Sequence, residues 1–142
     1  MKKVSFHYAD KDLKISEKNK IRDFIEYIFI HENKILKKLD YVFCSDNYLL
    51  RINNHFLNHN YYTDVITFNL SDSTEEIIGE IYISIDRVSE NAINFGVSVK
   101  KELLRVIFHG SLHLCGYKDK TKSEIIKIRK KEDKYIRDFE NI

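Results

Sequence analysis

Two histidines four residues apart, followed by a glycine, constrain this chain more than any other feature of its sequence. His109 and His113 stand at positions i and i+4 of a largely apolar run, and Gly116 follows the second histidine. On an α-helix this spacing puts both imidazoles on one face, about one turn apart. Gly116 is suited to end that helix, because the residue after a helix often takes a left-handed conformation that glycine adopts without strain. The stretch therefore predicts a helix that presents two imidazoles and is followed by a reversal of the chain.

Asp119 follows the predicted reversal and can return to the same face as a third metal ligand. An H-x-x-x-H spacing on a helix is typical of zinc proteins, and three protein ligands with one open position are the arrangement of a catalytic zinc. We therefore predict one zinc ion per chain, bound by His109, His113 and Asp119. The alternative interpretation is that Asp119 is a solvated turn residue between two lysines. Glu124 is then the reserve candidate for the third ligand.

A second histidine pair, His55 and His59, has the same spacing but a different setting. Residues 53–60 contain four asparagines, a residue type that favours turns over helix interiors. We predict that this pair lies in a loop. His59 facing a cleft stays open as a minor alternative.

The size and composition of the chain favour one domain over residues 1–142. With 142 residues and 43% hydrophobic content, a single sizeable core is expected. The sequence contains neither an apolar run of about 18 residues nor the apolar segment of a signal peptide, so we expect no membrane association. Cys44 and Cys115 are far apart and form no C-x-x-C pair, which favours a reducing, cytoplasmic location. Cys115 faces another side of the predicted helix than His109, and we predict that it is a packing residue.

Charge is unevenly distributed along the chain, although the net charge is only +2. Residues 63–86 contain six acidic residues and neither lysine nor arginine, whereas residues 118–142 contain nine basic and six acidic residues. A basic end suits a phosphate backbone. A modest excess of charge on a helix is also what an ordinary solvated face shows, so both interpretations stay open.

Hydrophobic spacing predicts about four strands and about five helices. Runs that alternate or are rich in β-branched residues predict strands over Val4–Tyr8, Leu39–Cys44, Thr63–Asn69 and Ile77–Ser84. The last two strands are close in sequence and are expected to pair antiparallel. Helices are predicted to begin at Ser16, at Asp46 or Asn47, at Asp86, at Ser98 and near Ser123. This pattern predicts a single α+β domain with a mixed sheet of about four strands and a zincin-like metal helix.

Three motifs resemble those of the YbeY family of bacterial metal-dependent endoribonucleases, also called rRNA maturation factors. They occur along the chain in the same order as in the family. The stretch from His109 to Tyr117 is similar to the family's H-G-x-L-H-L-x-G-Y signature. Thr63–Phe68 and Gly79–Ser84 are similar to its T-[DN]-V-L-S-F and G-D-I-x-I-S strands. The length and the order of elements agree along the whole chain.

This resemblance implies a third zinc ligand and an RNA contact at two positions where the sequence departs from the family. The family usually has Asp-His after its G-Y, and that histidine is its third ligand; here the two residues are Lys118 and Asp119. We therefore assign the ligand role to Asp119 as a substitution. The arginine that the family usually carries before its T-D-V strand, for RNA contact, corresponds to Leu57, so that role is not transferred.

The resemblance implies cleavage of single-stranded RNA, small-subunit rRNA 3′-end maturation and ribosome quality control. The expected partners are single-stranded RNA, rRNA and the ribosomal small subunit, with neither membrane nor DNA. Gly110 stands where H-E-x-x-H peptidases have their general base, which argues against peptide hydrolysis. A hydrolase of another substrate and a non-catalytic ribosome-associated factor with a structural metal stay open. The nucleophile, either water or the RNA 2′-hydroxyl, also stays open.

Overall fold

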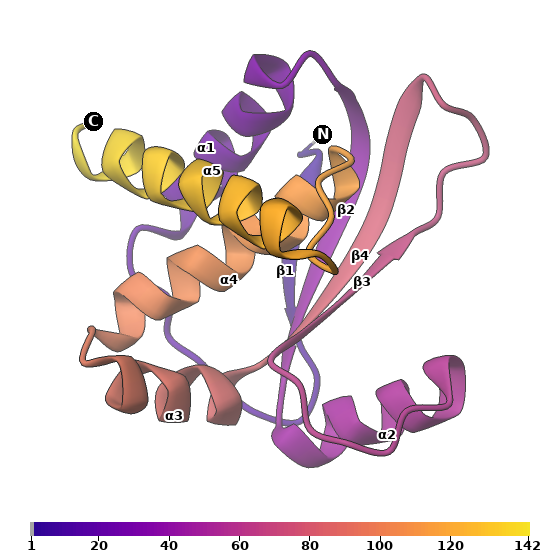
Figure 1. Ribbon diagram of the computed structural model, residues 1–142, viewed down its shortest axis with the longest axis vertical. Helices are drawn as coiled ribbons and strands as arrows, with labels where there is room; N and C mark the ends of the chain where they lie inside the picture. Colours follow the sequence, from indigo (N-terminus) through magenta and orange to yellow (C-terminus); the bar gives the residue numbers. More distant parts are fainter. Residues whose placement is uncertain (1) are drawn as a thin grey trace.

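A computed structural model describes residues 2–142 of the chain as a four-stranded sheet and five helices (Figure 1). The elements in chain order are β1 (Val4–Tyr8), α1 (Lys18–His31), β2 (Ile35–Cys44), α2 (Asp46–Leu57), β3 (Val65–Asn69), β4 (Glu76–Ser84), α3 (Ile85–Phe95), α4 (Val99–Leu114) and α5 (Lys122–Glu140). The predicted α+β class is confirmed. Among the helices of residues 2–142, none is both long enough and apolar enough to span a membrane.

The sheet is mixed, with the strand order β1-β2-β4-β3. β1, β2 and β4 are parallel, and β3 pairs antiparallel with β4 at one edge, as predicted from their short separation. Val65 at the start of β3 lies opposite Ile83 near the end of β4. The chain therefore enters β3 at the end of the sheet where β4 leaves it.

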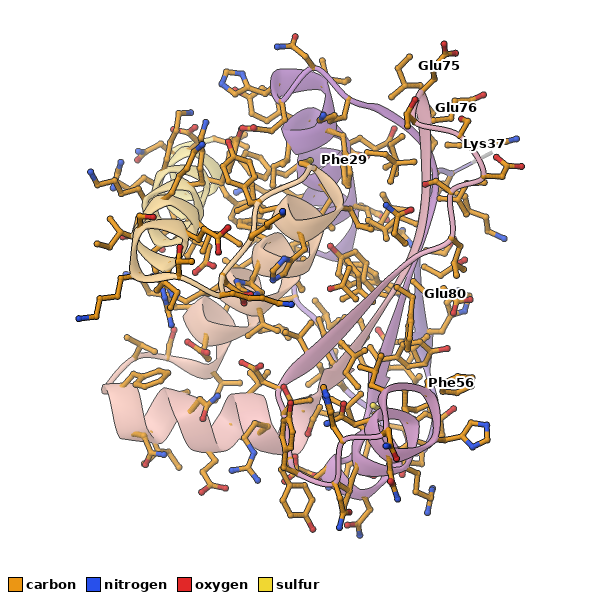
Figure 2. The ribbon with its side chains drawn as sticks, turned by 45° about the vertical axis from the view of Figure 1, so that its right-hand side comes forward. Phe29, Lys37, Phe56, Glu75, Glu76 and Glu80 are labelled. Carbon is orange, nitrogen blue, oxygen red and sulfur yellow. The ribbon has the colours of Figure 1, made fainter. Side chains whose placement is uncertain are left out.

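The main core lies between one face of the sheet and the helices α1 and α4, and α5 covers α4 from outside (Figure 1). Alternate residues of β4 point into this core, and Ile81 and Ile83 are fully buried there. Phe29 of α1 lies on the core side of the sheet, whereas Lys37 and Glu80 point away from it (Figure 2). A smaller cluster of Cys44, Leu49 and Ile66 packs beneath α2.

Helix α4 is held against the sheet by a buried tyrosine and a glycine contact. The hydroxyl of Tyr41 on β2 donates to the carbonyl oxygen of Ile107 at 2.8 Å and lies 2.6 Å from the Ser111 hydroxyl. Gly110 faces Ile81, and an added Cβ there would come within 2.8 Å of the Ile81 side chain. The missing side chain lets α4 approach β4 closely, which fixes the position of the helix that carries both motif histidines.

Three predicted helix starts are wrong by one or two residues. Helices α2 and α3 are capped by Ser45 and Ser84, whose hydroxyls accept backbone N–H groups, while Asp46 and Asp86 lie in the first turns. The cap of α1 is Glu17, in a left-handed conformation, rather than Ser16. In α2 and α3, serine and aspartate are both good caps, so neighbouring candidates cannot be separated by propensity alone.

The asparagine-rich segment also differs from its prediction. Helix α2 continues to Leu57, so His55 lies in its last turn and not in a loop, and only His59 follows the helix. Strand β2 begins at Ile35, earlier than predicted, and β3 begins at Val65. Leu57, to which no RNA-contact role was assigned, is the exposed last residue of α2.

Candidate metal centre

The helix that carries both histidines begins and ends where the sequence predicts. The Ser98 hydroxyl caps α4 by accepting the backbone N–H of Lys101. Gly116 has a φ of 104°, a left-handed value, and the N–H of Tyr117 reaches back to the carbonyl of Leu112 at 3.0 Å. The chain reverses at this glycine, and the reversal returns Asp119 to the face of α4 that carries the histidines.

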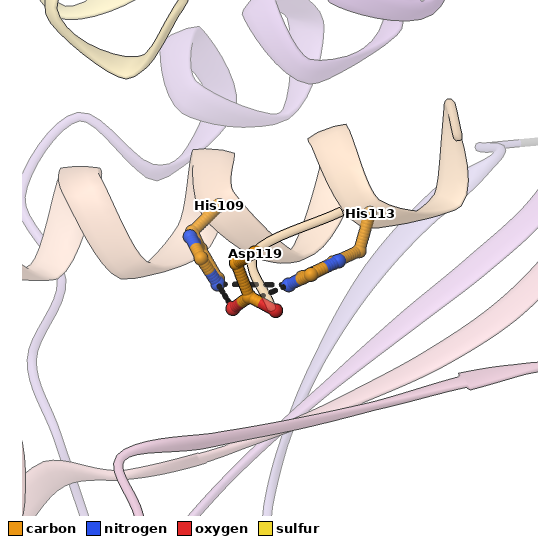
Figure 3. Close-up of side chains that lie close together, drawn as sticks. All are labelled: His109, His113 and Asp119. Carbon is orange, nitrogen blue, oxygen red and sulfur yellow. Dashed lines mark hydrogen bonds and ion pairs between the residues drawn. The ribbon is translucent and has the colours of Figure 1, made fainter. Parts of the chain in front are cut away.

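His109, His113 and Asp119 converge on one point (Figure 3). The two Nε2 atoms are 2.9 Å apart, and Oδ2 of Asp119 lies 3.3 Å from Nε2 of His109 and 3.2 Å from Nε2 of His113. A tetrahedral zinc with bonds of about 2.0–2.1 Å separates its ligand atoms by roughly 3.3 Å. The three atoms therefore form a triangle of the size that a tetrahedral metal ion needs.

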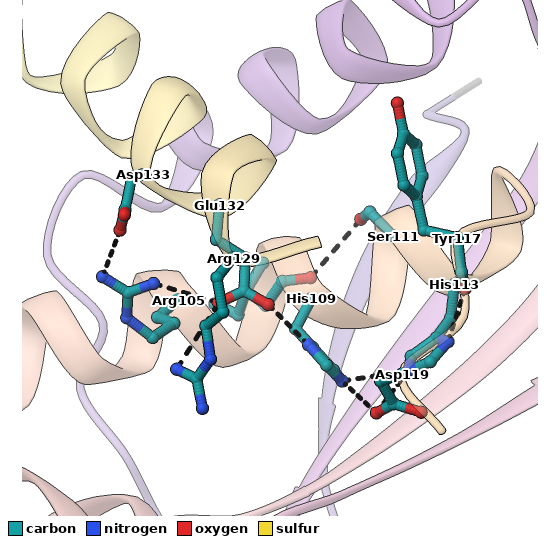
Figure 4. A network of polar contacts seen from close by, with 10 residues as sticks. Arg105, His109, Ser111, His113, Tyr117, Asp119, Arg129, Glu132 and Asp133 are labelled. Carbon is teal, nitrogen blue, oxygen red and sulfur yellow. Dashed lines mark hydrogen bonds and ion pairs between the residues drawn. The ribbon is translucent and has the colours of Figure 1, made fainter. Parts of the chain in front are cut away.

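The other ring nitrogen of each histidine has its own acceptor (Figure 4). Nδ1 of His109 lies 2.6 Å from Oε2 of Glu132, and Nδ1 of His113 lies 2.9 Å from the carbonyl oxygen of Tyr117. An acceptor at Nδ1 holds the proton there and leaves the Nε2 lone pair free for a metal. Both rings are thus fixed in the tautomer that metal binding requires.

Glu132 of α5 is almost completely buried and links the centre to an ion-pair network. Its side chain is 1% exposed, and its Oε1 accepts a hydrogen bond from Arg105 at 3.0 Å. Arg105 also pairs with the exposed carboxylate of Asp133 at 2.8 Å. A buried carboxylate needs compensating donors, and Arg105 and His109 supply them.

Carboxylates around His109 control its protonation. Burial acts to lower the pKa of His109, but the hydrogen bond to Glu132 and the charges of Glu132, Asp119 and Asp64 outweigh it, so the pKa is raised. Burial also raises the pKa of Asp64, which lies just before β3, and the charge of His109 opposes this shift. A cation at the Nε2 triangle is therefore favoured by the surrounding field.

The remaining candidates from the sequence lie away from the triangle. Glu124 accepts the backbone N–H groups of Lys120 and Thr121 in a capping box at the start of α5, so its carboxylate is engaged there. Cys115 is buried in the core, as predicted. Nδ1 of His59 lies 3.0 Å from the Tyr61 hydroxyl, outside this centre.

Glu132 was missed by the sequence analysis, although the sequence contains a signal for it. The buried residues of α5 recur at Ile128, Tyr135, Ile136 and Phe139, and Glu132 occupies the gap in this helical spacing. A charged residue at a core position of an amphipathic helix requires a buried partner, which here is a metal-ligand candidate on α4.

The three ligand candidates are partly open to solvent. The exposed fractions of the side chains are 20% for His109, 25% for His113 and 42% for Asp119. The fold and the site together define an α+β protein with a solvent-accessible candidate metal centre on its central helix.

Comparison with known proteins identifies the family. The family model described as Endoribonuclease YbeY matches residues 5–140, and the chain belongs to this family. A Flavobacterium psychrophilum protein named Endoribonuclease YbeY is 46% identical over 136 residues, which cover 96% of each chain. A Cytophaga hutchinsonii protein of the same name is 46% identical over 92% of this chain and 91% of its own.

A solved structure has the same fold. The solution structure of a Thermotoga maritima protein superposes with a TM-score of 0.64, at 28% identity, and the match covers 96% of this chain and 88% of that chain. The fold is therefore found in an experimentally determined structure, over nearly the full length of both chains.

Proposed function

We propose that residues 1–142 form a single metal-dependent endoribonuclease domain that cleaves single-stranded RNA in rRNA processing. The observation that carries this proposal is the triangle of His109, His113 and Asp119 atoms within a chain of the Endoribonuclease YbeY family. The relatives' names support RNA as the substrate class. The proposal includes small-subunit rRNA 3′-end maturation, ribosome quality control, contact with the ribosomal small subunit and a cytoplasmic location.

We propose zinc as the metal, with one ion per chain. Two imidazoles and a carboxylate are zinc ligands, and the triangle leaves a fourth tetrahedral position open. A zinc ion there would supply Lewis-acid chemistry, by polarising a phosphoryl oxygen and by making water a stronger acid. Asp119 lowers the net charge of the centre by one relative to a third histidine. We therefore expect a weaker Lewis acid than a three-histidine site would hold.

The residues around the centre orient the ligands. Glu132 and the Tyr117 carbonyl hold the Nδ1 protons of His109 and His113, so both Nε2 lone pairs point at one position. The partial exposure of all three ligand candidates leaves a path by which a phosphate can reach that position.

Peptide hydrolysis is disfavoured by the residue after the first histidine. H-E-x-x-H peptidases have a glutamate there as general base. This chain has Gly110, which is buried against Ile81, so a side chain at this position would meet the core.

Exposed aromatic rings support a preference for single-stranded RNA. Tyr61 and Tyr62 are 56% and 51% exposed, in the segment that leads into Asp64 and β3. Unpaired bases can splay and stack on aromatic side chains, which an A-form duplex prevents. We expect the same sequence to be cut faster as a single strand than after annealing to its complement.

The test is cleavage of a labelled RNA by pure protein, first stripped with a chelator and then supplied with zinc. We expect cleavage only with zinc, and the His109→Ala/His113→Ala double variant should stay inactive and contain less metal. Circular dichroism of the stripped protein checks the fold. Stripped protein that remains folded and still cuts RNA would contradict metal dependence. Zinc-loaded protein that cuts no RNA would contradict the nuclease assignment.

A further inference from the structure

Arg129 stands beside the candidate metal centre without a role in holding it. It lies in the first half of α5, and in Figure 4 its guanidinium is on the same side of α4 as His109 and Asp119. Its Nη1 atom is 3.8 Å from Oε1 of Glu132, whose other oxygen is 2.6 Å from Nδ1 of His109. The guanidinium is therefore separated from a ligand candidate by a single carboxylate.

The contact between Arg129 and Glu132 is too long to be a hydrogen bond. Glu132 already has its partners, because Arg105 donates to it at 3.0 Å and His109 contacts its other oxygen. The two arginines also differ in exposure, at 20% for the Arg105 side chain and 56% for that of Arg129. Arg105 thus completes the buried network, while the guanidinium of Arg129 keeps donors for an external anion.

The charge of Arg129 also acts on carboxyl groups of other elements. Burial raises the pKa values of Asp64, which lies before β3, and of Glu102 on α4, and the positive charge of Arg129 opposes both shifts. The positive field of Arg129 therefore reaches from α5 to the start of β3, the strand that follows the exposed tyrosines.

We propose that Arg129 is a phosphate-binding residue, which pairs with an RNA phosphate next to the one held at the metal centre. This inference rests on the proposed function and adds a substrate contact to it. A guanidinium matches a phosphate with two parallel hydrogen bonds, and its weak hydration favours that contact over water. Lysine would keep the charge at this position but not the paired geometry.

Arg129→Gln tests the inference, with Arg137→Gln as the matched control. Arg137 is an exposed arginine in the last turn of the same helix, about 12 Å farther along at 1.5 Å per residue. Both variants lose one positive charge, so they differ only in where it is lost. Binding of a fluorescent single-stranded RNA is followed by anisotropy in chelator, which prevents cleavage, at several salt concentrations. Zinc content and cleavage rate are measured on the loaded proteins.

We expect Arg129→Gln to weaken RNA binding about 10-fold and to reduce the slope of log affinity against log salt by about 0.7, the value of one phosphate contact in a single strand. Arg129→Lys should keep the slope and bind with intermediate affinity. Arg137→Gln should bind like wild type, and all variants should retain zinc, because Arg105 still holds Glu132.

Two results would overturn the inference. Equal RNA affinity of the Arg129→Gln and Arg137→Gln variants would show that position does not matter. Zinc loss on Arg129→Gln would make the residue a part of the metal centre instead of a substrate contact. Both results differ from a failure of the proposed function, in which zinc-loaded wild type itself neither binds nor cuts RNA.

Discussion

Nδ1 of His109 and Oε2 of Glu132 lie 2.6 Å apart, although 23 positions separate the two residues in the sequence. The contact joins the helix that carries the candidate ligands to the helix that closes the fold. The orientation of the His109 ring therefore depends on how α5 packs against α4. The core contacts that hold α5 in place also hold this ring in position for a metal. Residues that orient a metal-bound histidine in this way typically change metal affinity when they are replaced.

Glu132→Gln should weaken zinc binding about 10- to 100-fold, the usual range for a partner of a metal-ligating histidine. Glutamine keeps the size and one acceptor but removes the charge that pairs with Arg105 and favours a cation at His109. The free energy of unfolding of the metal-free protein should fall by about 1–3 kcal/mol, because a charged hydrogen bond is lost in a buried site. Competition for zinc with a chromophoric chelator measures the zinc affinity, and urea denaturation measures the free energy of unfolding.

Asp133→Asn is the matched control for this variant. Asp133 pairs with the same arginine at 2.8 Å, but its side chain is half exposed and does not contact His109. We expect zinc affinity within twofold of wild type, since an exposed pair contributes about 0–1 kcal/mol. Zinc affinities that are equal for the Glu132→Gln and Asp133→Asn variants would refute the orienting role of Glu132.

The motif helix could be predicted from sequence because its signals are local. Ser98 caps the helix, the histidines lie one turn apart, and Gly116 ends it, all within α4 and its flanking residues. The return of Asp119 to the same face also follows from a short reversal directly after that glycine. These features depend on backbone preferences over a few residues, which a single sequence contains.

The end of α2 could not be predicted because a tertiary contact overrides the local preference. Asn53 is 1% exposed within α2, and its side-chain amide donates to the carbonyl oxygen of Tyr61 at 3.0 Å. The asparagine that argues for a turn therefore ties the helix to the segment that follows it. Glu132 is a similar case, because its partner on α4 is far away in the sequence.

Gly110→Ala should destabilise the protein, although alanine is the better helix former. The new methyl group would lie 2.8–2.9 Å from two carbons of the fully buried Ile81 side chain. Overpacking costs about 1–3 kcal/mol, and the gain of about 1 kcal/mol from removing a helical glycine offsets part of it. We expect a net loss of about 1 kcal/mol in urea denaturation, with lower zinc affinity because the neighbouring His109 shifts.

Ile81→Val provides the check on this mechanism, because it removes the Ile81 carbon nearest to the new methyl group. The effects of the two substitutions should be non-additive, and the double variant should be more stable than the sum of the single changes predicts. Additive effects would show that the contact between Gly110 and Ile81 is not the cause.

Glu32 should contribute stability that is lost in acid. Its carboxylate accepts hydrogen bonds from the hydroxyls of Tyr117 and Tyr135 and from the Lys131 ammonium group. The bonds from Lys131 and Tyr135 join the end of α1 to α5. Burial raises the pKa of Glu32, but these donors outweigh it, so the pKa lies below its ordinary value of 4.5. A lowered pKa means that the contribution is complete above about pH 4.5 and is lost as the pH falls through the folded-state value.

Glu32→Gln should therefore lower the free energy of unfolding by about 1–3 kcal/mol at pH 7 and by progressively less below pH 4.5. The measurement is urea denaturation between pH 3 and pH 7 in chelator, since metal binding is itself pH-dependent. Asp23→Asn, which neutralises an exposed carboxylate on the same helix, should change stability little at any pH. A Glu32→Gln effect that is constant from pH 7 to pH 3 would be inconsistent with this assignment.

Asp119 decides whether the centre has two or three protein ligands. Its side chain is 42% exposed, so Asp119→Ala should keep the fold, while zinc affinity falls because the third ligand atom is lost. Asp119→His should retain zinc, since imidazole is also a good zinc ligand, and Asp119→Asn should bind poorly, because the amide oxygen brings no charge.

Glu124→Ala is the control: it should lower helix stability by removing half of the capping box and leave zinc affinity unchanged. A zinc titration of these proteins, with circular dichroism for folding, separates the cases. If all three Asp119 variants bind zinc like wild type, Asp119 is a solvated turn residue and not a ligand.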